Sequence, residues 1–519
     1  AFPRHPEIGA NAGSLTSDDI LALDVVCREN HVELVPNLQS LGHQRDLLNL
    51  SRYHHLAETP WNWTLAVGQE GTYQLLDELY GDLLPAFSSD WLNVDADEPY
   101  DVGRGQSKAL TDELGPGRVY LRHIQRLHDL AAKHGKRLMM WADMFWHYPE
   151  LIGEMPEDIL FLDWWYEPKD RYATVDTIAK AGRPFYVCPG TSSWTSFFPR
   201  LDNAIHNIRT FVRDGVQAGA AGMLLTDWGD GGHYQPISNS WYPYLWGAEC
   251  AWTGSATTTE AFDPAFSRLF VGDTSGQVVA AMHRLGNTMK NAPVWPTTWN
   301  TPMALWEDPI AGDLAEVVPV EVVTETRAAA ENLFAVLDLV RDPAIRADLA
   351  LSAGLIHFAT NKVDMTRRIH QTLAGIASGD LAAEQGTAHL TSLIAALQLQ
   401  RRIIPAVVAE FEQRWLAHAR RSEIQVNLDR FAALLARYDV AIPWLEAQRD
   451  ACAIGQPVDA DLATYDRGDY AVLWQESKRN IENLVDLIGE QVLPPDIQLS
   501  LARLRERTAG IIPTAVGFQ

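Results

Sequence analysis

Short apolar runs alternate with longer amphipathic stretches over roughly the first half of the chain. The runs predict β-strands, because each is short, rich in β-branched, aliphatic and aromatic residues, and bounded by turn residues. Strands are expected at residues 32–37, 91–95, 137–143, 159–165, 184–190 and 222–230. Helices are expected at residues 14–31, 72–87, 119–135, 172–182 and 203–219. Apolar strands separated by helices predict a parallel sheet that is buried on both faces.

Polar and aromatic residues gather directly after each predicted strand. These clusters are residues 37–43, 95–98, 141–143, 164–167, 189–194 and 227–233. Chemistry at one end of every strand is typical of an eight-stranded barrel, whose active site is built from the loops after the strands. We therefore predict an α/β fold, a (β/α)8 TIM-type barrel. The chain starts at Ala1 rather than Met, so we expect the first two strand–helix units to lie upstream of it.

From about Pro319 the pattern changes to helical spacing with many Ala, Leu and Arg residues. Long helices are expected at residues 323–342, 344–373, 391–423 and 427–451. We therefore place a catalytic barrel at residues 1–300 and an α-helical C-terminal domain at residues 301–519. Packing within this domain explains the apolar faces of the helices, and a homodimer through them stays an open alternative.

Composition narrows the range of partners. The chain of 519 residues carries a formal net charge of −25, which argues against nucleic acid and against a membrane surface. No apolar run reads as a membrane span, and the first residues show no signal-peptide pattern, so a cytoplasmic location is expected. The 4 cysteines lack paired spacing, and no cofactor is expected. The 18 tryptophans fit either a carbohydrate site or a Trp-rich core.

The stretch WLNVDADEPYDVG, residues 91–103, ends an apolar strand on three carboxylates and turns at Pro99. Charged groups at such a place are costly unless they are solvated, paired or used. Asp97 and Glu98 are neighbours, and repulsion between adjacent carboxylates favours a proton on one of them at neutral pH, as a general acid requires. We therefore expect Asp97 and Glu98 to be the catalytic residues.

Around this strand end the chain resembles the family 20 glycoside hydrolases, the β-N-acetylhexosaminidases, over about residues 16–252. The stretches that carry the resemblance are LVPNLQSLGH, VDADEPYDVG, LMMWADM, LDWWYE and LLTDWGD, in that order. The resemblance implies a retaining, substrate-assisted mechanism on a terminal N-acetylhexosamine. Glu98 would protonate the glycosidic oxygen, Asp97 would orient the substrate's 2-acetamido group as it attacks the anomeric carbon, and His43 would support the acid.

The resemblance and the strand-end positions together supply the remaining candidates for sugar binding. They are Trp141, Asp143, Trp164, Glu167, Tyr186, Trp194, Asp227, Trp228 and His233. Asp227, Asp230 and His233 could also be read as metal ligands, but a charged sugar-binding loop explains them, so no metal is expected. The chain departs from the family where the family's His-x-Gly-Gly reads Asn93-Val94-Asp95-Ala96, which adds a third carboxylate.

Two other functions stay open from the sequence. The first is a two-carboxylate retaining β-glycosidase with Glu98 as the acid and Glu167 or Asp143 as the nucleophile. The second is a catalytically silent barrel that binds carbohydrate. The identity of the sugar, its linkage and its leaving group are not determined by these residues.

Overall fold

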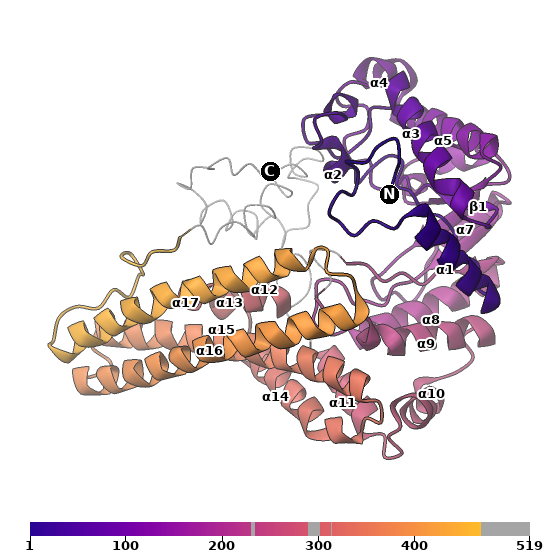
Figure 1. Cartoon of the computed structure of the whole chain (residues 1–519). Helices are drawn as coiled ribbons and strands as arrows, with labels where there is room; N and C mark the ends of the chain where they lie inside the picture. Colours follow the sequence, from indigo (N-terminus) through magenta and orange to yellow (C-terminus); the bar gives the residue numbers. More distant parts are fainter. Residues whose placement is uncertain (230–233, 289–300, 313, 469–519) are drawn as a thin grey trace.

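Five short parallel strands form the sheet of the computed structural model, which describes residues 1–229, 234–288, 301–312 and 314–468 (Figure 1). The strands are β1 (Trp91–Asn93), β2 (Arg137–Trp141), β3 (Leu160–Trp164), β4 (Phe185–Cys188) and β5 (Gly222–Met223). They pair in chain order, β1-β2-β3-β4-β5, and every pair is parallel. Five of the six predicted strands and the parallel arrangement are therefore confirmed.

The strand predicted at residues 32–37 forms only one isolated bridge. Asn37 pairs in parallel with Asn93, and the backbone N–H of Asn93 donates to the carbonyl of Pro36 at 2.9 Å. This segment thus runs beside β1 without a regular ladder, so the prediction of a full strand there is wrong. The described residues contain no strand pair that closes the sheet into a ring, and the two upstream units remain a prediction.

The helices that connect the strands lie where the apolar periodicity places them. They are α1 (Ser17–Glu29), α3 (Glu70–Leu83), α5 (Pro116–Lys133), α7 (Thr174–Lys180) and α8 (Leu201–Ala218). Shorter helices fill the loops: α2 (Arg45–Leu48), α4 (Lys108–Leu114) and α6 (Met144–His147). Thr16 forms a capping box with Asp19 at the start of α1, which satisfies backbone donors that a helix end leaves free.

The two faces of the sheet have different roles because side chains alternate along a strand. One face carries Leu138, Met140, Phe161, Phe185 and Val187, which join the large core under the helices. The other carries a separate small cluster of Met139, Trp141, Leu160, Leu162 and Cys188, against which Trp164, Tyr186 and Trp228 pack. We call this second face the inner face. It is the face on which the predicted sugar-binding tryptophans gather.

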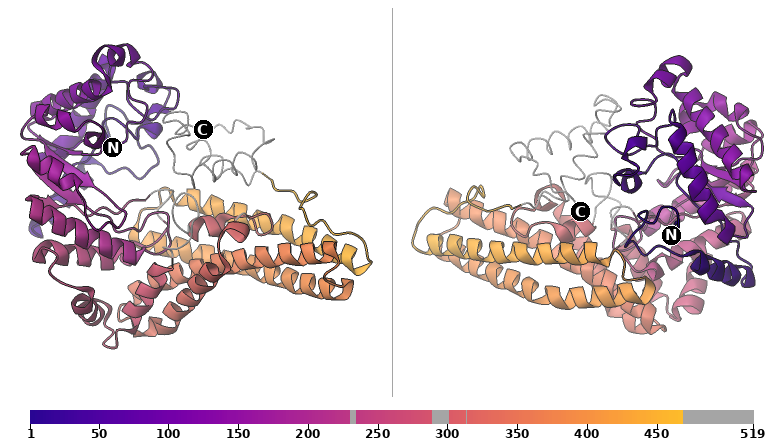
Figure 2. Two further views of the ribbon diagram at one scale, coloured as in Figure 1. Left: turned by 180° about the vertical axis from the view of Figure 1, so that it is seen from behind. Right: turned by 45° about the horizontal axis from the view of Figure 1, so that its top comes forward.

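Everything after β5 in the described residues is helical, as predicted. These helices are α9 (Trp241–Thr253), α10 (Thr259–Phe266), α11 (Gln277–Asn287), α12 (Thr301–Trp306), α13 (Leu314–Val317), α14 (Val320–Val336), α15 (Pro343–Ser378), α16 (Ala383–His418) and α17 (Ile424–Ala453). Helices α15, α16 and α17 run side by side as a long arm that extends from the α/β body (Figures 1 and 2). Helix α11 packs against both α8 and α14 and so links the two parts.

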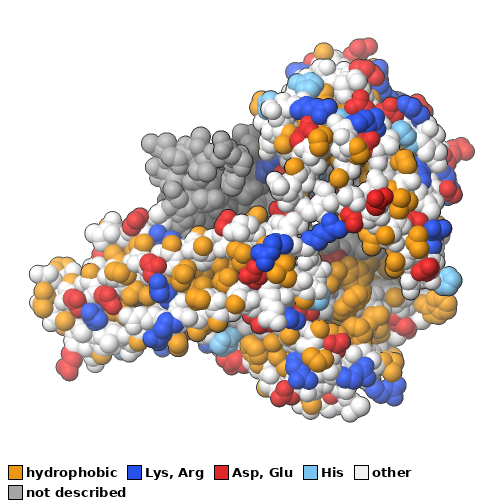
Figure 3. Space-filling model, viewed as in Figure 1, with side chains coloured by type: hydrophobic (Ala, Val, Ile, Leu, Met, Phe, Trp, Pro, Cys, Tyr) orange, Lys and Arg blue, Asp and Glu red, His pale blue; other side chains and the backbone are white. Residues whose placement is uncertain are grey.

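Helix α16 is the one described helix that is long and apolar enough to cross a membrane by length and composition, with 28% of its most apolar window buried. The expectation that no such segment exists therefore does not hold by this criterion. Hydrophobic side chains are visible along the arm in Figure 3. Packing against α15 and α17 explains much of this apolar character, because a helix in a bundle passes the same test as a membrane span.

A buried carboxylate ties the helical arm to the α/β body. Asp348 on α15 is fully buried and accepts hydrogen bonds at 2.7 Å from Ser238 and from Nε2 of His418. Nearby, the side chain of Asn239 donates to Ser352 on α15 at 2.6 Å. Ser238 and Asn239 belong to the short helix Ile237–Ser240, which follows the loop after β5. The arm thereby helps to hold a loop of the predicted site.

We expect Asp348→Ala to lower the free energy of unfolding by about 2–3 kcal/mol, because it leaves the charged and polar partners of a buried carboxylate unpaired. Urea unfolding followed by circular dichroism measures the change. The control is Asp338→Ala, which removes an exposed carboxylate 3.7 Å from Arg346 and should cost less than about 1 kcal/mol. Equal losses in the two variants would contradict this role of Asp348.

Candidate active site

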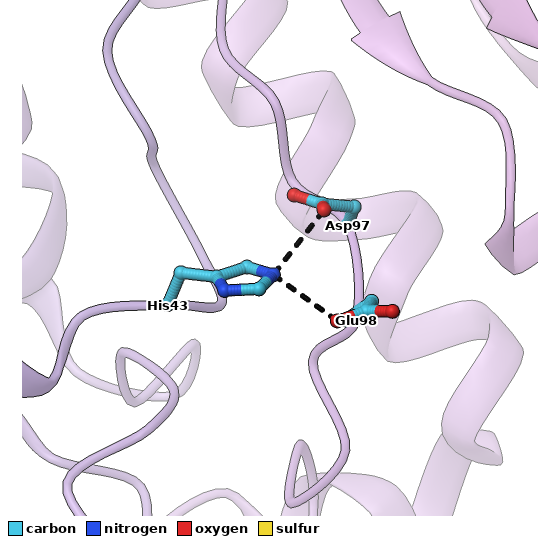
Figure 4. Close-up of side chains that lie close together, drawn as sticks. All are labelled: His43, Asp97 and Glu98. Carbon is cyan, nitrogen blue, oxygen red and sulfur yellow. Dashed lines mark ion pairs between the residues drawn. The ribbon is translucent and has the colours of Figure 1, made fainter. Parts of the chain in front are cut away.

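A single histidine nitrogen contacts both predicted catalytic carboxylates. Nε2 of His43 lies 3.2 Å from Oδ2 of Asp97 and 3.3 Å from Oε2 of Glu98 (Figure 4). The side chain of His43 is 38% exposed, that of Asp97 15% and that of Glu98 29%, so the three form an accessible group rather than part of the core. The structure therefore brings together the three residues that the sequence predicted.

The backbone that carries these carboxylates is strained. Asp95, Ala96 and Glu98 have φ angles of 54°, 62° and 47°, in the left-handed region that non-glycine residues rarely adopt. Each such residue costs about 1–2 kcal/mol, and strain of this kind persists only where the surroundings impose it. Asp95 and Ala96 stand where the related family has two glycines, so this chain keeps a glycine-like backbone turn with two larger residues.

Gln39 bridges the loop of His43 and the end of β1. Its Nε2 donates to Oδ1 of Asp97 at 2.6 Å, and its Oε1 accepts from the backbone N–H of Ala96 at 3.0 Å. Asp97 is therefore held on one oxygen by Gln39 and on the other by His43. The sequence analysis quoted this stretch but assigned Gln39 no role.

The third carboxylate, Asp95, points into the protein. Asn37, Asn93 and Trp141 all donate to its Oδ1, at 2.9, 3.0 and 2.7 Å. Burial, reinforced by the charge of Asp97, raises the pKa of Asp95 to about 7. Asp95 therefore anchors the strand end and fixes the ring of Trp141, and it adds less negative charge near neutral pH than an ordinary aspartate.

Asp143, a candidate nucleophile, instead holds the backbone of the acid. Its Oδ2 accepts a hydrogen bond of 3.0 Å from the backbone N–H of Glu98, and its Oδ1 is buried without a hydrogen-bond partner among the described residues. Burial and then the charge of Asp97 raise the pKa of Asp143 to about 7. A carboxyl that retains a proton near neutral pH is a poor nucleophile.

The aromatic candidates line the inner face of the sheet. Trp141 is 3% exposed and belongs to the inner cluster, while Trp164, Tyr186 and Trp228 pack against it. The rings of Trp141 and Trp228 meet edge to face with centroids 5.9 Å apart. Tyr186 lies deeper along its strand, directly beside Gly222, whose missing side chain leaves room for the ring. These residues form an apolar floor close to the end of β1.

Tyr166 connects several of these rings, although the sequence analysis did not single it out. Its ring stacks on Trp164 at 5.1 Å and meets Trp194 edge to face at the same distance, and its hydroxyl accepts from Nε1 of Trp228 at 2.8 Å. Trp194 therefore joins the inner-face aromatic group through Tyr166. The adjacent Trp164–Trp165–Tyr166 run after a strand was the available signal.

Three further candidates have different outcomes. Asp227 accepts from Thr191 at 2.8 Å, so it is tied to the loop after β4. Glu167 is exposed and lines a hollow with Asp202 and His206 on the outer helix α8, so the structure does not bring it to Asp97 and Glu98. His233, like Asp230, lies outside the described residues.

The charge of His43 balances the two carboxylates. Burial opposes the charge on its ring, but the hydrogen bonds to Asp97 and Glu98 outweigh this effect and raise the pKa of His43 to about 10. The ligand atoms of His43, Asp97 and Glu98 also lie within 4.8 Å of one another, close enough to hold a metal ion. A charged imidazole has no free lone pair at Nε2 for a metal, so the geometry fits the ion-paired state better.

A second aromatic group stands beside the acid and was missed by the sequence analysis. It consists of Trp61, Trp63 and Tyr100, and we call it the outer cluster. The rings of Trp61 and Trp63 stack at 5.1 Å, and Nε1 of Trp63 donates to the backbone carbonyl of Glu98 at 2.7 Å. The Trp-x-Trp spacing in a polar loop could have indicated it.

Comparison with known proteins gives one family match. The model of "Glycosyl hydrolase family 20, catalytic domain" matches residues 7–270. Beta-hexosaminidase 1 of Coccidioides posadasii is 27% identical over 117 residues, which cover 21% of this chain and 20% of that protein. The chain therefore spans about a fifth of that relative's length.

Two solved structures are also similar. The chitobiase of Flavobacterium johnsoniae is 12% identical, with 76% of this chain and 68% of that chain covered and a TM-score of 0.41. The beta-N-acetylhexosaminidase of Bacteroides fragilis is 15% identical, with 51% and 60% covered and a TM-score of 0.41. We base no inference on similarity at this level.

The ring of His43 should remain protonated up to about pH 10. Its pKa is raised relative to the unfolded chain, so the ion pairs contribute fully to stability below about pH 6.5 and lose that contribution as the pH rises through about 10. NMR of histidine-labelled protein should find the His43 resonances constant between about pH 6 and 8. In the Asp97→Asn/Glu98→Gln double variant the ring should titrate at lower pH. Titration of the wild-type ring near pH 6.5 would contradict the pairing.

Proposed function

The chain belongs to glycosyl hydrolase family 20, and on this premise we propose that it is an exo-acting, β-N-acetylhexosaminidase-like glycosidase of the retaining, substrate-assisted kind. The family match together with the parallel sheet supports a TIM-barrel-type fold with an added helical part. The observation that carries the proposal is the contact of one histidine nitrogen with two adjacent carboxylates at the end of a parallel strand.

Glu98 acts as the general acid in this proposal. It protonates the glycosidic oxygen while the bond from that oxygen to the anomeric carbon breaks, and it later removes a proton from the water that completes hydrolysis. Glu98 is negatively charged after the first proton transfer. The imidazolium of His43, 3.3 Å away, stabilises that charge at the moment when it develops.

The nucleophile is the 2-acetamido oxygen of the substrate. It attacks the anomeric carbon and forms a cyclic, positively charged oxazolinium-like intermediate, which water then opens. Asp97 accepts the acetamido N–H and offers its negative charge to the developing ring. Its two fixed contacts, with Gln39 and His43, hold the carboxylate ready for this task before the substrate binds.

The substrate in this proposal carries a terminal N-acetylhexosamine. The inner-face rings of Trp164 and Trp228 offer apolar surfaces for the sugar ring. Asp227, held by Thr191, is available for sugar hydroxyls. No protein nucleophile and no cofactor is needed for these steps.

The positions of the two alternative nucleophiles weigh against the two-carboxylate mechanism. Asp143 is engaged with the backbone of Glu98 and has a raised pKa. Glu167 faces the hollow along α8. Neither is placed as a free carboxylate opposite Glu98, which a protein nucleophile has to be.

We expect Glu98→Gln to reduce kcat by about two to four orders of magnitude on a disaccharide with a terminal N-acetylhexosamine. The loss should be smaller on the nitrophenyl glycoside of the same sugar, because nitrophenolate leaves without protonation. Steady-state kinetics with both substrates, and with a nitrophenyl glycoside that lacks the acetamido group, measures these differences. The wild type should turn over the last substrate poorly.

The matched control is Glu157→Gln, at an exposed glutamate in the loop before β3. Equal losses on both leaving groups in Glu98→Gln would show that the acid is misassigned. Efficient hydrolysis without the acetamido group, with a loss in Glu167→Gln as large as that in Glu98→Gln, would support the two-carboxylate mechanism instead. Sugar binding without any turnover would support the silent barrel.

A further inference from the structure

The outer cluster is built from two loops that meet beside the acid. Trp61 and Trp63 come from the loop after α2, and Tyr100 follows Glu98 by two residues. The interplanar angles are 14° for Trp61 and Trp63, 29° for Trp61 and Tyr100, and 21° for Trp63 and Tyr100. The three ring planes are thus close to parallel.

This cluster is fixed rigidly to the catalytic group. Besides its bond to the carbonyl of Glu98, the ring of Trp63 lies 4.5 Å from that of His43, centroid to centroid. The buried carboxylate of Glu58 accepts from Ser107 at 2.6 Å and from the backbone of Gly105 at 3.0 Å. This carboxylate therefore clamps the loop of the tryptophans to the loop after Glu98.

The outer cluster is open to solvent, unlike the aromatic core. Tyr100 is 38% exposed, and Trp61 and Trp63 are half-buried, whereas Trp246 and Tyr80 are completely buried. Core packing therefore does not account for all of this aromatic surface. Aromatic surface left open beside a catalytic group is typical of a ligand site.

The two aromatic groups are linked to opposite ends of the Asp95–Glu98 turn. The inner group is tied to Asp95 through Nε1 of Trp141 at 2.7 Å, and the outer cluster to Glu98 through Nε1 of Trp63. A sugar cleaved with Glu98 as the acid has its leaving group on the side of Glu98. The outer cluster lies where that leaving group has to be.

We propose that the outer cluster binds the leaving group, and that this group is a second sugar ring. The inference rests on the proposed function and names its substrate class: oligosaccharides or glycans in which a terminal N-acetylhexosamine is β-linked to another pyranose. The flat C–H face of a pyranose matches a set of near-parallel aromatic rings. A small alcohol is too short to use this surface, and Asp97, Glu98 and the net charge of −25 disfavour an anionic group.

The test compares two substrates that share the terminal N-acetylhexosamine. In the disaccharide the leaving group is a sugar, whereas in the glycosyl fluoride it is a fluoride ion that is too small to contact the outer cluster. For each variant we take the ratio of kcat/KM for the disaccharide to kcat/KM for the fluoride. Trp61→Ala should lower this ratio about 10- to 100-fold, mainly through KM, and Trp61→Phe should recover much of it.

Tyr100→Ala gives a second reading if Trp61→Ala fails to fold, and it should lower the same ratio at least about fivefold. The matched control is Trp252→Ala, at a tryptophan of α9 that is 91% exposed, for which the ratio should match that of the wild type. Circular dichroism and thermal melts identify variants that do not fold.

Each other outcome overturns the inference in a distinguishable way. If kcat/KM falls equally for both substrates in folded variants, the outer cluster supports the acid and binds no leaving group. If the wild type cleaves the fluoride but no disaccharide, the proposed function stands and the inference about the second sugar fails. If the wild type cleaves neither, the proposed function itself fails, and the inference fails with it.

Discussion

Two adjacent carboxylates at the end of β1 repel each other, and the contacts of one imidazolium with both of them offset that repulsion. Nε2 of His43 lies 3.2 Å from Asp97 and 3.3 Å from Glu98, and these contacts raise the pKa of the histidine to about 10 against the opposing effect of burial. The neighbouring Asp95 and Asp143 carry raised pKa values of about 7, chiefly because of burial. The site thereby concentrates carboxyl groups while limiting its net negative charge near neutral pH.

The geometry of that pair depends on supports from several elements. Three residues of the Asp95–Glu98 turn adopt left-handed φ angles, and the hydrogen bonds of Gln39, Asn37, Trp141 and Asp143 hold the turn in place. Farther away, the helical arm holds the loop after β5 through Asp348. A catalytic constellation needs such surrounding contacts, because a displacement of about 1 Å can cost about a hundredfold in rate.

Local periodicity was enough to predict β1 to β5, the connecting helices and the helical arm, because each depends mainly on its own sequence. The segment at 32–37 is apolar but forms only a bridge to Asn93, an outcome set by long-range pairing. The adjacent Asp97–Glu98 pair and His43 were predicted from the motif and its resemblance. Trp61 and Trp63 were missed because they reach the acid through a loop contact that spacing does not encode, and Glu167 was misplaced because it lies beyond the strand, where alternation no longer fixes direction.

The central claim is that Asp97 serves the acetamido group of the substrate and that no protein carboxylate attacks the sugar. The most direct measurement is the affinity, by calorimetry, of a thiazoline analogue of the cyclic intermediate for the wild type and for Asp97→Asn. We expect the wild type to bind the thiazoline at least about a hundredfold more tightly than the parent N-acetylhexosamine, and Asp97→Asn to lose most of that advantage while still binding the parent sugar. A thiazoline that binds the wild type no better than the parent sugar, or equally well in the folded Asp97→Asn variant, would contradict the account.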